Sequence, residues 1–319
     1  MLTVLGDLIA DFNLRIPSFP IARGSLLRVA HLDLGPGGAT NVAITAARLG
    51  LPVTCLGEVG DDRFGAIVLE GLRAEGIDVS GVIVTRGGET PLAGVIVDQT
   101  GEPAYLGYPG RQSVHSLPDS WQSRIAEAEA LFVDGWVDDE HAPELILQGM
   151  ACASQAGVPS FFDPGPGNPV YDNRWHMEAC ALAAVLLATE DEAVHLTGEA
   201  DPMASARELL RSGPEMVVIK RGPAGCLLLR GEEVHIAPGL PVEARDATGA
   251  GDGLDAAVIY GFLRRLPLEA IGALANATGA AKVRKLGTGL NMPTLAEIQE
   301  MLERFAPAHA ELLSRMQSS

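Results

Sequence analysis

Residues 246–252 read Asp-Ala-Thr-Gly-Ala-Gly-Asp and combine two acids with a turn of small residues. An apolar run with small side chains follows over 253–264 and predicts a helix that begins at this turn. The first N–H groups of a helix have no partner within it, and the helix dipole adds positive potential there. We therefore expect the N–H groups of Ala250, Gly251 and Asp252 to form a site for a phosphate-sized anion.

The acid at the rim of this turn adds a second chemical capability. A carboxylate at the position of Asp252 can accept a proton from a hydroxyl group while that hydroxyl attacks a phosphoryl group held over the N–H cluster. An ordinary loop, in which Asp246 caps the turn and the glycines serve packing, is the alternative for this stretch taken alone. The pattern predicts phosphoryl transfer to an alcohol, with Asp252 as the base.

A second group of polar residues and glycines lies near the N-terminus. Asp11 follows a predicted buried strand at 2–6, at the end where open α/β sheets collect ligands, although a solvated loop acid is an equal alternative. Gly37 and Gly38 precede Asn41 and an Ala-rich helix, and such a glycine pair lets the backbone approach a ligand closely. The lysine of a Gly-x4-Gly-Lys-[Ser/Thr] phosphate loop is missing, so a nucleotide site of that kind is not predicted.

Both stretches resemble signatures of the ribokinase-like (PfkB) carbohydrate kinases. The C-terminal signature of that family is Asp-Thr-x-Gly-Ala-Gly-Asp, from which Ala247 departs, and residues 37–43 with Gly50 and Gly60 follow the N-terminal one. The resemblance covers about residues 2–303. It implies an α/β, ribokinase-like three-layer αβα fold with a mostly parallel central sheet and a small β-sheet lid. It also implies ATP-dependent phosphorylation of a hydroxyl on a small sugar, with Mg²⁺ and in some relatives K⁺.

The resemblance assigns expected roles to individual residues. In the catalytic group, Asp252 would be the base, and the N–H groups of Gly249, Ala250 and Gly251 would stabilise the transferring phosphoryl group. The substrate group would be Asp11, Gly37, Gly38 and Asn41, and the nucleotide group would be Lys220, Gly222, Gly225, Asn276, Thr189 and Glu192. Glu192 would hold Mg²⁺ through water, and Asp246 with carbonyls around Gly287 would form a monovalent-cation site.

Three positions depart from the family pattern. Ile9 stands where a polar substrate contact is frequent, Ala247 replaces the signature threonine, and Thr189 replaces an asparagine. A hydroxyl donates and accepts fewer hydrogen bonds than an amide, so weaker metal coupling follows at Thr189. These departures keep open a catalytically silent sugar- or nucleotide-binding relative. The alternative to a nucleotide role for Lys220 is a solvated strand end. Asp163 resembles a residue at a family strand end near the active site, and the alternative is a turn residue before proline.

The elements that position these residues follow from the apolar pattern. From residue 131 onward, apolar runs alternate with helical stretches, which predicts a mostly parallel sheet with helices on both faces. Alternating segments within about 12–34 and 90–108 predict strands of a small lid sheet. We interpret residues 1–319 as a single kinase domain with this lid, through which the family resemblance suggests a homodimer.

Composition excludes several classes of protein. The chain has 319 residues, 47% hydrophobic content and a formal net charge of -18, so it can bury a core and offers no basic stripe for nucleic acid. No apolar stretch reaches the length of a membrane span, and no targeting segment is predicted. The four cysteines are widely spaced, which argues against a metal site or disulfide framework and fits the cytoplasm.

Three other activities would each need residues of a different kind. A nucleoside kinase of the same family would want an apolar or aromatic wall for the base, for which Tyr105 and Tyr108 are candidates. A phosphosugar kinase of this family usually has a lysine in the N-terminal Gly-Gly region, and none is present. A dinucleotide-dependent oxidoreductase would need Gly-x-Gly-x-x-Gly after the first strand, which is missing. The pattern does not select the sugar.

Overall fold

The computed structural model describes residues 1–136, 142–166 and 174–311. Its centre is an eight-stranded sheet in the order β14-β13-β12-β11-β10-β9-β1-β4. The strands from β12 to β4 are parallel, and β13 and β14 extend the sheet antiparallel. The bounds of this sheet are β1 (Leu2–Leu5), β4 (Val53–Leu56), β9 (Ala130–Asp134), β10 (Ser160–Asp163), β11 (Val185–Thr189), β12 (Met216–Lys220), β13 (Cys226–Arg230) and β14 (Glu233–Ala237).

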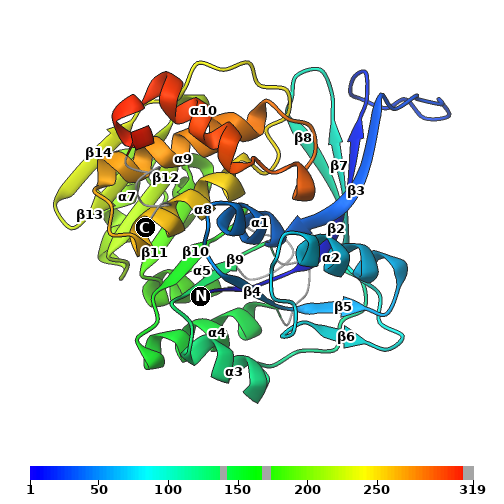
Figure 1. The fold of residues 1–319 in the computed structure, drawn as a ribbon, viewed down its shortest axis with the longest axis horizontal. Helices are drawn as coiled ribbons and strands as arrows, with labels where there is room; N and C mark the ends of the chain where they lie inside the picture. The colour runs from blue at the N-terminus through cyan, green and yellow to red at the C-terminus, as the bar shows by residue number, and fades with distance from the viewer. Residues whose placement is uncertain (137–141, 167–173, 312–319) are drawn as a thin grey trace.

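Helices cover both faces of this sheet (Figure 1). One face carries α1 (Thr40–Arg48), α2 (Arg63–Ala74), α8 (Ala250–Leu263), α9 (Leu268–Val283) and α10 (Leu295–Phe305). The other carries α3 (Asp119–Ala126), α4 (Ala142–Ala156), α5 (Trp175–Leu182), α6 (Glu190–Thr197) and α7 (Pro202–Arg211). Side chains alternate along each strand, so in β12 Val218 packs in the first core, and Val217 and Ile219 pack in the second. This three-layer arrangement confirms the predicted fold class.

A separate four-stranded sheet projects from the body, seen at the upper right of Figure 1. Its order is β3-β2-β7-β8, formed by β2 (Leu8–Arg15), β3 (His31–Gly38), β7 (Leu92–Val97) and β8 (Pro103–Tyr108). A short parallel pair, β5 (Glu58–Gly60) and β6 (Ile83–Thr85), lies below it. Two 3-10 turns complete the elements, Gly222–Ala224 and Gly289–Asn291.

The two faces of the lid differ in polarity because strand side chains alternate with a period of two. Asp11 and Asn13 stand on the face toward the body and are buried there. The opposite face aligns Leu14 with Leu32 and Ile96, and it is largely apolar. A sheet with one polar and one apolar face fits a lid that binds a polar ligand beneath it.

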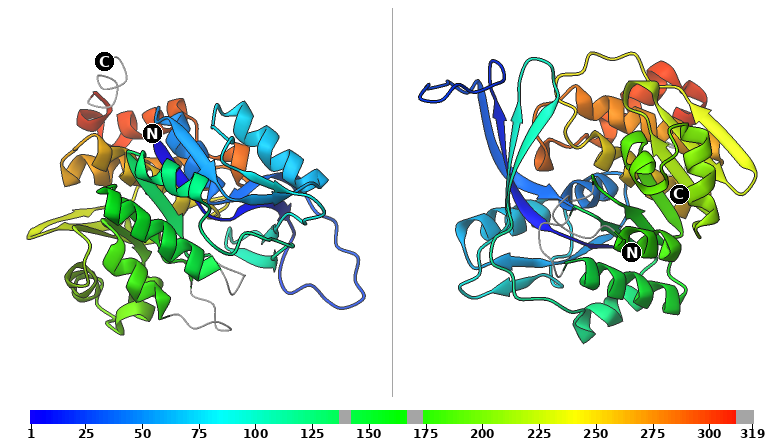
Figure 2. Two further views of the ribbon diagram at one scale, coloured as in Figure 1. Left: turned by 90° about the horizontal axis from the view of Figure 1, so that it is seen from below. Right: turned by 180° about the vertical axis from the view of Figure 1, so that it is seen from behind.

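Several predicted boundaries need correction. The lid strands begin at Leu8 and run on to Gly38, and no strand forms over 16–30, which extends as a long loop (Figure 2). Gly37 and Gly38 lie at the end of β3 and not in a free loop. Pro36 and three glycines in 35–38 are residues typical of loops, but pairing with β2 keeps them extended and carries the lid strand beyond the predicted bound at about residue 34. Beyond α10, residues 307–311 are helical.

Candidate active site

The polar residues of the central sheet gather at the carboxyl ends of its parallel strands. Asp134 ends β9, Asp163 ends β10 and Lys220 ends β12, and all three are buried. The first turn of α8 faces the same edge, so it brings Asp252 among them. Burial and the nearby carboxylate of Asp7 raise the pKa of Asp134 well above its usual range. Parallel strand topology is the physical reason that distant segments meet here.

The turn before α8 has the geometry of an anion site, with one correction. Gly249 is the N-cap in the left-handed conformation, φ 75°, which favours glycine. The N–H of Ala250 donates to the carbonyl of Ala247 over 3.2 Å, so it is not unpaired as expected. The backbone N–H groups of Gly249, Gly251 and Asp252 donate no hydrogen bond within the described chain. These three groups are therefore the available donors.

Asp252 is held in place from α1. The Asn41 amide donates to the Asp252 carboxylate over 2.8 Å, and the Asn41 carbonyl oxygen accepts from the N–H of Gly289 over 2.8 Å. Burial raises the pKa of Asp252 to about 6, with a further contribution from the charge of Asp163. A base with this pKa is ionised at neutral pH and still binds a proton readily. Asn41 thus positions the base, and its predicted contact with substrate stays a prediction.

Asp11 lies on the lid side of the same space. Its carboxylate accepts a hydrogen bond of 2.5 Å from the Thr288 hydroxyl, which also accepts from the Asn13 amide over 3.1 Å. Burial raises the pKa of Asp11 to about 7. Gly37 is required beside it, because a Cβ there would lie 2.0 Å from the Asp11 carboxyl group. Gly38, φ 59°, would bring a Cβ within 2.8 Å of the Asp7 carbonyl oxygen.

Lys220 is buried and does not form a solvated strand end. Its ammonium donates to Asp163 over 2.7 Å and to Asp255 over 3.2 Å. These carboxylates hold the pKa of Lys220 above its ordinary value. Burial raises the pKa of Asp255, and so does the charge of Asp163, because the two acids share one ammonium. A Cβ on Gly251 would lie 3.6 Å from the Lys220 ammonium. Lys220 therefore flanks the anion-binding turn.

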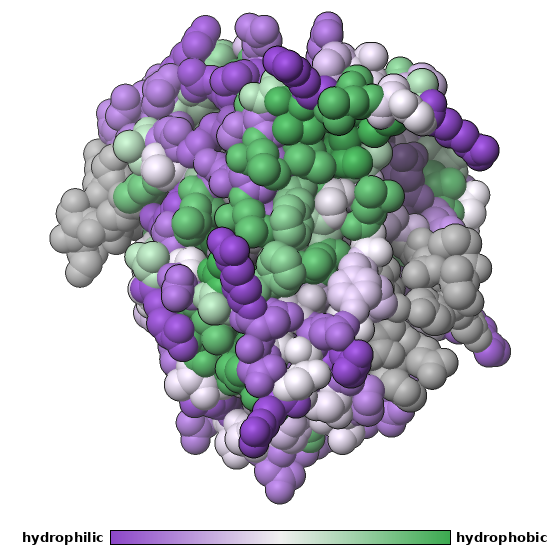
Figure 3. All heavy atoms as spheres, turned by 90° about the vertical axis from the view of Figure 1, so that its right-hand side faces the viewer, coloured by the Kyte–Doolittle hydropathy of each residue, from purple (hydrophilic) through white to green (hydrophobic). Residues whose placement is uncertain are grey.

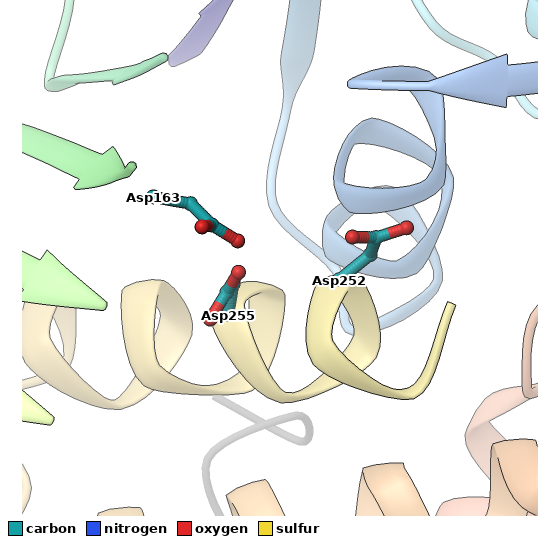
Figure 4. Close-up of side chains that lie close together, drawn as sticks. All are labelled: Asp163, Asp252 and Asp255. Atoms are coloured by element: carbon teal, nitrogen blue, oxygen red, sulfur yellow. The ribbon is translucent and has the colours of Figure 1, made fainter. Parts of the chain in front are cut away.

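Three carboxylates could supply oxygen ligands to a divalent ion. One oxygen each of Asp163, Asp252 and Asp255 lies within 4.8 Å of the others (Figure 4). Asp163 and Asp255 point toward each other in Figure 4, and Asp252 turns toward α1. Oxygen ligands of this kind suit Mg²⁺. The ammonium of Lys220 already bridges Asp163 and Asp255. Asp252 has no bond to this ammonium, so its carboxylate is the one open to a metal-nucleotide complex.

The predicted nucleotide residues are structurally engaged. Thr189 and Glu192 form a capping box at the start of α6, in which the Glu192 carboxylate accepts from the Thr189 N–H over 2.7 Å. Burial and the charge of Asp163 raise the pKa of Glu192. The Asn276 amide donates to the carbonyls of Ala237 and Pro238, and so holds the loop after β14.

Gly222 begins a 3-10 turn after β12, and Gly225 closes against the loop that follows β14. A Cβ on Gly225 would lie 2.1 Å from the Ala237 carbonyl oxygen, so this glycine is required for packing. The nucleotide roles of Gly222 and Gly225 stay predictions.

Several site residues were not identified from the sequence. Thr288, Asp255 and Asp134 lie within ordinary loop, helix and strand patterns and carry no motif of their own. Lys282 lies in the last turn of α9, where a lysine is ordinarily solvated, but it is fully buried. Tyr105 of the lid contacts Trp136 edge-to-face with ring centroids 5.5 Å apart, and its side chain is 46% exposed. Tyr108 instead bonds Glu89, so only Tyr105 of the two faces the site.

The anion-binding turn, the buried base and the lid define the protein class as a kinase that phosphorylates a hydroxyl group. Comparison with known proteins agrees with this class, because the model of the family described as "pfkB family carbohydrate kinase" matches residues 1–295. The chain therefore belongs to the pfkB family of carbohydrate kinases. This membership confirms the predicted enzyme class, an ATP-dependent phosphotransferase that acts on an alcohol group of a sugar.

Individual relatives extend along nearly the whole chain. The chain is 30% identical to an ATP-dependent ribose-1-phosphate kinase of Halopiger xanaduensis, covering 92% of this chain and 96% of that protein. It is 28% identical to a probable fructokinase-7 of Arabidopsis thaliana, covering 95% and 92%.

Two solved structures share the fold. Arabidopsis thaliana ribokinase with ribose and ATP has a TM-score of 0.80, 22% identity and coverage of 95% and 98%. A ribokinase II structure from E. coli with ATP and Mg²⁺ has a TM-score of 0.83, 21% identity and coverage of 95% and 99%. No described helix is long and apolar enough to span a bilayer.

Proposed function

We propose that this site transfers the γ-phosphoryl group of ATP to a hydroxymethyl or similar hydroxyl of a monosaccharide of the ribose or fructose type. The observation that carries the proposal is Asp252, a base with a pKa of about 6 at the mouth of an anion-binding turn. Asn41 fixes its carboxylate, and the N–H groups of Gly249 and Gly251 stand free beside it. Base and charge stabiliser thus occupy one turn of the chain.

The residues divide the reaction between two sides of the site. Asp11, with Gly37, Gly38 and Asn41 near it, binds the sugar hydroxyls from the lid side. Asp252 takes the proton of the attacking hydroxyl. The N–H groups of Gly249 and Gly251, with minor help from Ala250, stabilise the charge on the transferring group. Lid closure excludes water, which would otherwise compete as acceptor.

The nucleotide lies over the other side. Lys220, Gly222, Gly225, Asn276 and Thr189 border it, and Glu192 holds Mg²⁺ through water. When bound, Mg²⁺ offsets charge on the ATP phosphates. The cluster of carboxylate oxygens around Asp163 and Asp252 supports this assignment. The predicted K⁺ site at Asp246 and the carbonyls around Gly287 stays a prediction.

The domain organisation and assembly belong to the proposal as well. Residues 1–319 form a single kinase domain, with residues 8–38 and 92–108 supplying the lid. The apolar lid face carries Leu32 and Leu106, exposed by 61% and 66%, and Figure 3 shows hydrophobic side chains gathered on that side of the molecule. We infer a homodimer through this face. A cytoplasmic location stays a prediction.

A nucleoside kinase is the second candidate because Tyr105 and Trp136 form an aromatic wall at the lid. An aromatic face stacks on a purine or pyrimidine as well as on a sugar ring. The acceptor therefore decides between the two activities.

The test is ADP release from Mg²⁺-ATP over ribose, fructose, other hexoses, ketodeoxygluconate, inositol, ribose 1-phosphate and nucleosides. We expect turnover of a free monosaccharide, and a loss of about 10³-fold or more in Asp252→Asn, because the base is removed. The control is calorimetric ADP binding to the variant, which should persist. Turnover of nucleosides alone would replace the first candidate by the second, and turnover unaffected in Asp252→Asn would contradict the assigned base.

A further inference from the structure

Lys282 is a buried cation with no direct partner. It lies in the last turn of α9 and has no exposed surface. No hydrogen-bond acceptor contacts its ammonium group in the described part of the chain. A charged group left unpaired in the interior is costly, so a residue of this kind needs an explanation. Lys220, the other buried lysine, has two carboxylate partners and needs none.

The surroundings of Lys282 belong to the catalytic turn. A Cβ on Gly249 would lie 3.5 Å from the Lys282 side chain at Cε. The charges that act on its ammonium are those of Asp246 and Asp252, with Lys285 opposing them. Burial lowers the pKa of Lys282, and the charges of the two carboxylates offset part of this effect. The lysine therefore places a positive charge beside the residues that carry the phosphoryl group.

Asp246 is the counterpart of this charge. It is only 2% exposed, and it accepts hydrogen bonds from the N–H of Thr248 over 2.9 Å and from the N–H of Gly287 over 2.8 Å. These bonds join the catalytic turn to the loop after α9. Both carboxylate oxygens are thus already used by the protein, one on each loop. Each oxygen keeps a second lone pair, but a metal cation that took Asp246 as a ligand would stand next to an ammonium ion.

We propose that the Lys282 ammonium takes the place of a monovalent metal cation at the junction of the two loops. It neutralises buried Asp246 and keeps the N–H groups of Gly249 and Gly251 directed at the phosphoryl group, so nucleotide binding and turnover do not need K⁺. This inference rests on the kinase function proposed above, and it replaces the metal-binding role expected for Asp246 by a structural one.

The experiment compares Lys282→Met with wild-type enzyme, and uses Lys285→Met as the matched control. Methionine keeps most of the length and apolar volume of the lysine stem but removes the charge. Lys285 lies three residues further on, and its ammonium pairs with Glu297 and the carbonyl of Met292. ADP affinity by calorimetry and turnover are measured in buffers with tetramethylammonium or K⁺ as the cation.

We expect wild-type ADP affinity and turnover to agree within about twofold in the two buffers, because the positive charge is built in. Lys282→Met should lose about tenfold in ADP affinity. Its turnover should fall about 10²-fold without K⁺, since the donors at the turn are no longer held. K⁺ or NH₄⁺ should recover part of both, because the space left by the ammonium accepts a small cation. Lys285→Met should behave as the wild type in each buffer.

Two outcomes would overturn the inference. One is a wild-type ADP affinity that tightens about tenfold or more on adding K⁺. The other is a Lys282→Met variant that binds ADP as Lys285→Met does. If Lys282→Met fails to fold, the wild-type titration alone still decides. Because ADP binding needs no sugar, a negative result here is distinct from failure to find the acceptor.

Discussion

Asp252 and Asp11, two carboxylates with raised pKa values, border the proposed sugar site. Asp252 and Asp11 have pKa values of about 6 and about 7, and burial is the largest cause in both. The charge of Asp252 also raises the pKa of Asp11, and the Thr288 hydroxyl lowers it. The acid groups of this site are therefore tuned by their surroundings and are not ordinary surface acids.

The pH dependence of the enzyme follows from these values. Both groups act as anions, so kcat/KM should be constant above about pH 7 and fall as the pH drops through about 7 to 6. Thr288→Val removes the hydroxyl that donates to Asp11, so it should shift the acid limb to higher pH. The measurement is kcat/KM against pH for wild type and variant. An acid limb near pH 4 would show that neither carboxylate is perturbed.

The same shift predicts that Asp252 costs stability. A raised folded pKa means that folding favours the protonated acid, so this contribution is favourable below the unfolded pKa, near 3.8, and is lost as the pH rises through about 6. Asp252→Asn should therefore unfold with a free energy about 1–3 kcal/mol higher than wild type at pH 8, and with little difference at pH 4. Urea unfolding at the two pH values measures this. Equal stability at pH 8 would contradict the burial of the charge.

Gly251 tests whether the turn binds the phosphoryl group. It lies in the first turn of α8, and an added Cβ would meet nothing closer than the Lys220 ammonium at 3.6 Å. Gly251→Ala should leave folding intact or improve it by about 0.4–1 kcal/mol, because alanine lowers the entropy of the unfolded chain. Activity should fall about 10²-fold, since the methyl group stands in front of the free N–H donors. Thermal unfolding measures the stability of Gly251→Ala, and kcat measures its activity. A Gly251→Ala variant with wild-type kcat would show that the phosphoryl group binds elsewhere.

At the scale of elements, α8 and β12 are joined by the buried network of Lys220, Asp163 and Asp255. Removing one member of such a network has an effect that depends on what is left unpaired. Lys220→Met leaves two buried carboxylates and should lower the free energy of unfolding by about 3–5 kcal/mol. Asp255→Asn keeps the Lys220–Asp163 pair and should cost much less. Denaturant unfolding of both variants is the test, and equal small losses would argue against the ion network.

Element patterns explain which boundaries could be predicted. Strands of the central sheet have continuous apolar runs, and their order of appearance with helices indicates a parallel sheet. The end of the lid strand β3 could not be located, because Pro36 and three glycines in 35–38 favour a loop locally. Pairing of Ile9 with Gly37 and of Leu8 with Gly38 decides that segment. Hydrogen bonds between distant strands override local preference there.

At the scale of the whole molecule, the exposed apolar face of the lid is the feature that calls for a partner. Leu32→Glu combined with Leu106→Glu places charges on this face without disturbing a core, since both side chains are largely exposed. We expect the wild type to sediment as a dimer and the double variant as a monomer, because a charge in a buried apolar interface is unfavourable. Leu26→Glu is the control, since Leu26 is 95% exposed and lies outside the lid strands. A wild-type monomer at all concentrations would refute the dimer.

By itself, the sequence determined the family and the fold class, and it supplied the candidate catalytic and substrate residues, because short spacings carry them: Asp252 follows its glycine turn directly, and Asn41 follows Gly37 and Gly38. Tertiary structure decided what lies opposite these residues. Thr288 meets Asp11, Asp255 meets Lys220, and Lys282 lies beside Gly249, although nothing local marks any of them. Their roles depend on burial and on contacts between segments far apart in the chain, and these exist only after the sheet and helices have packed.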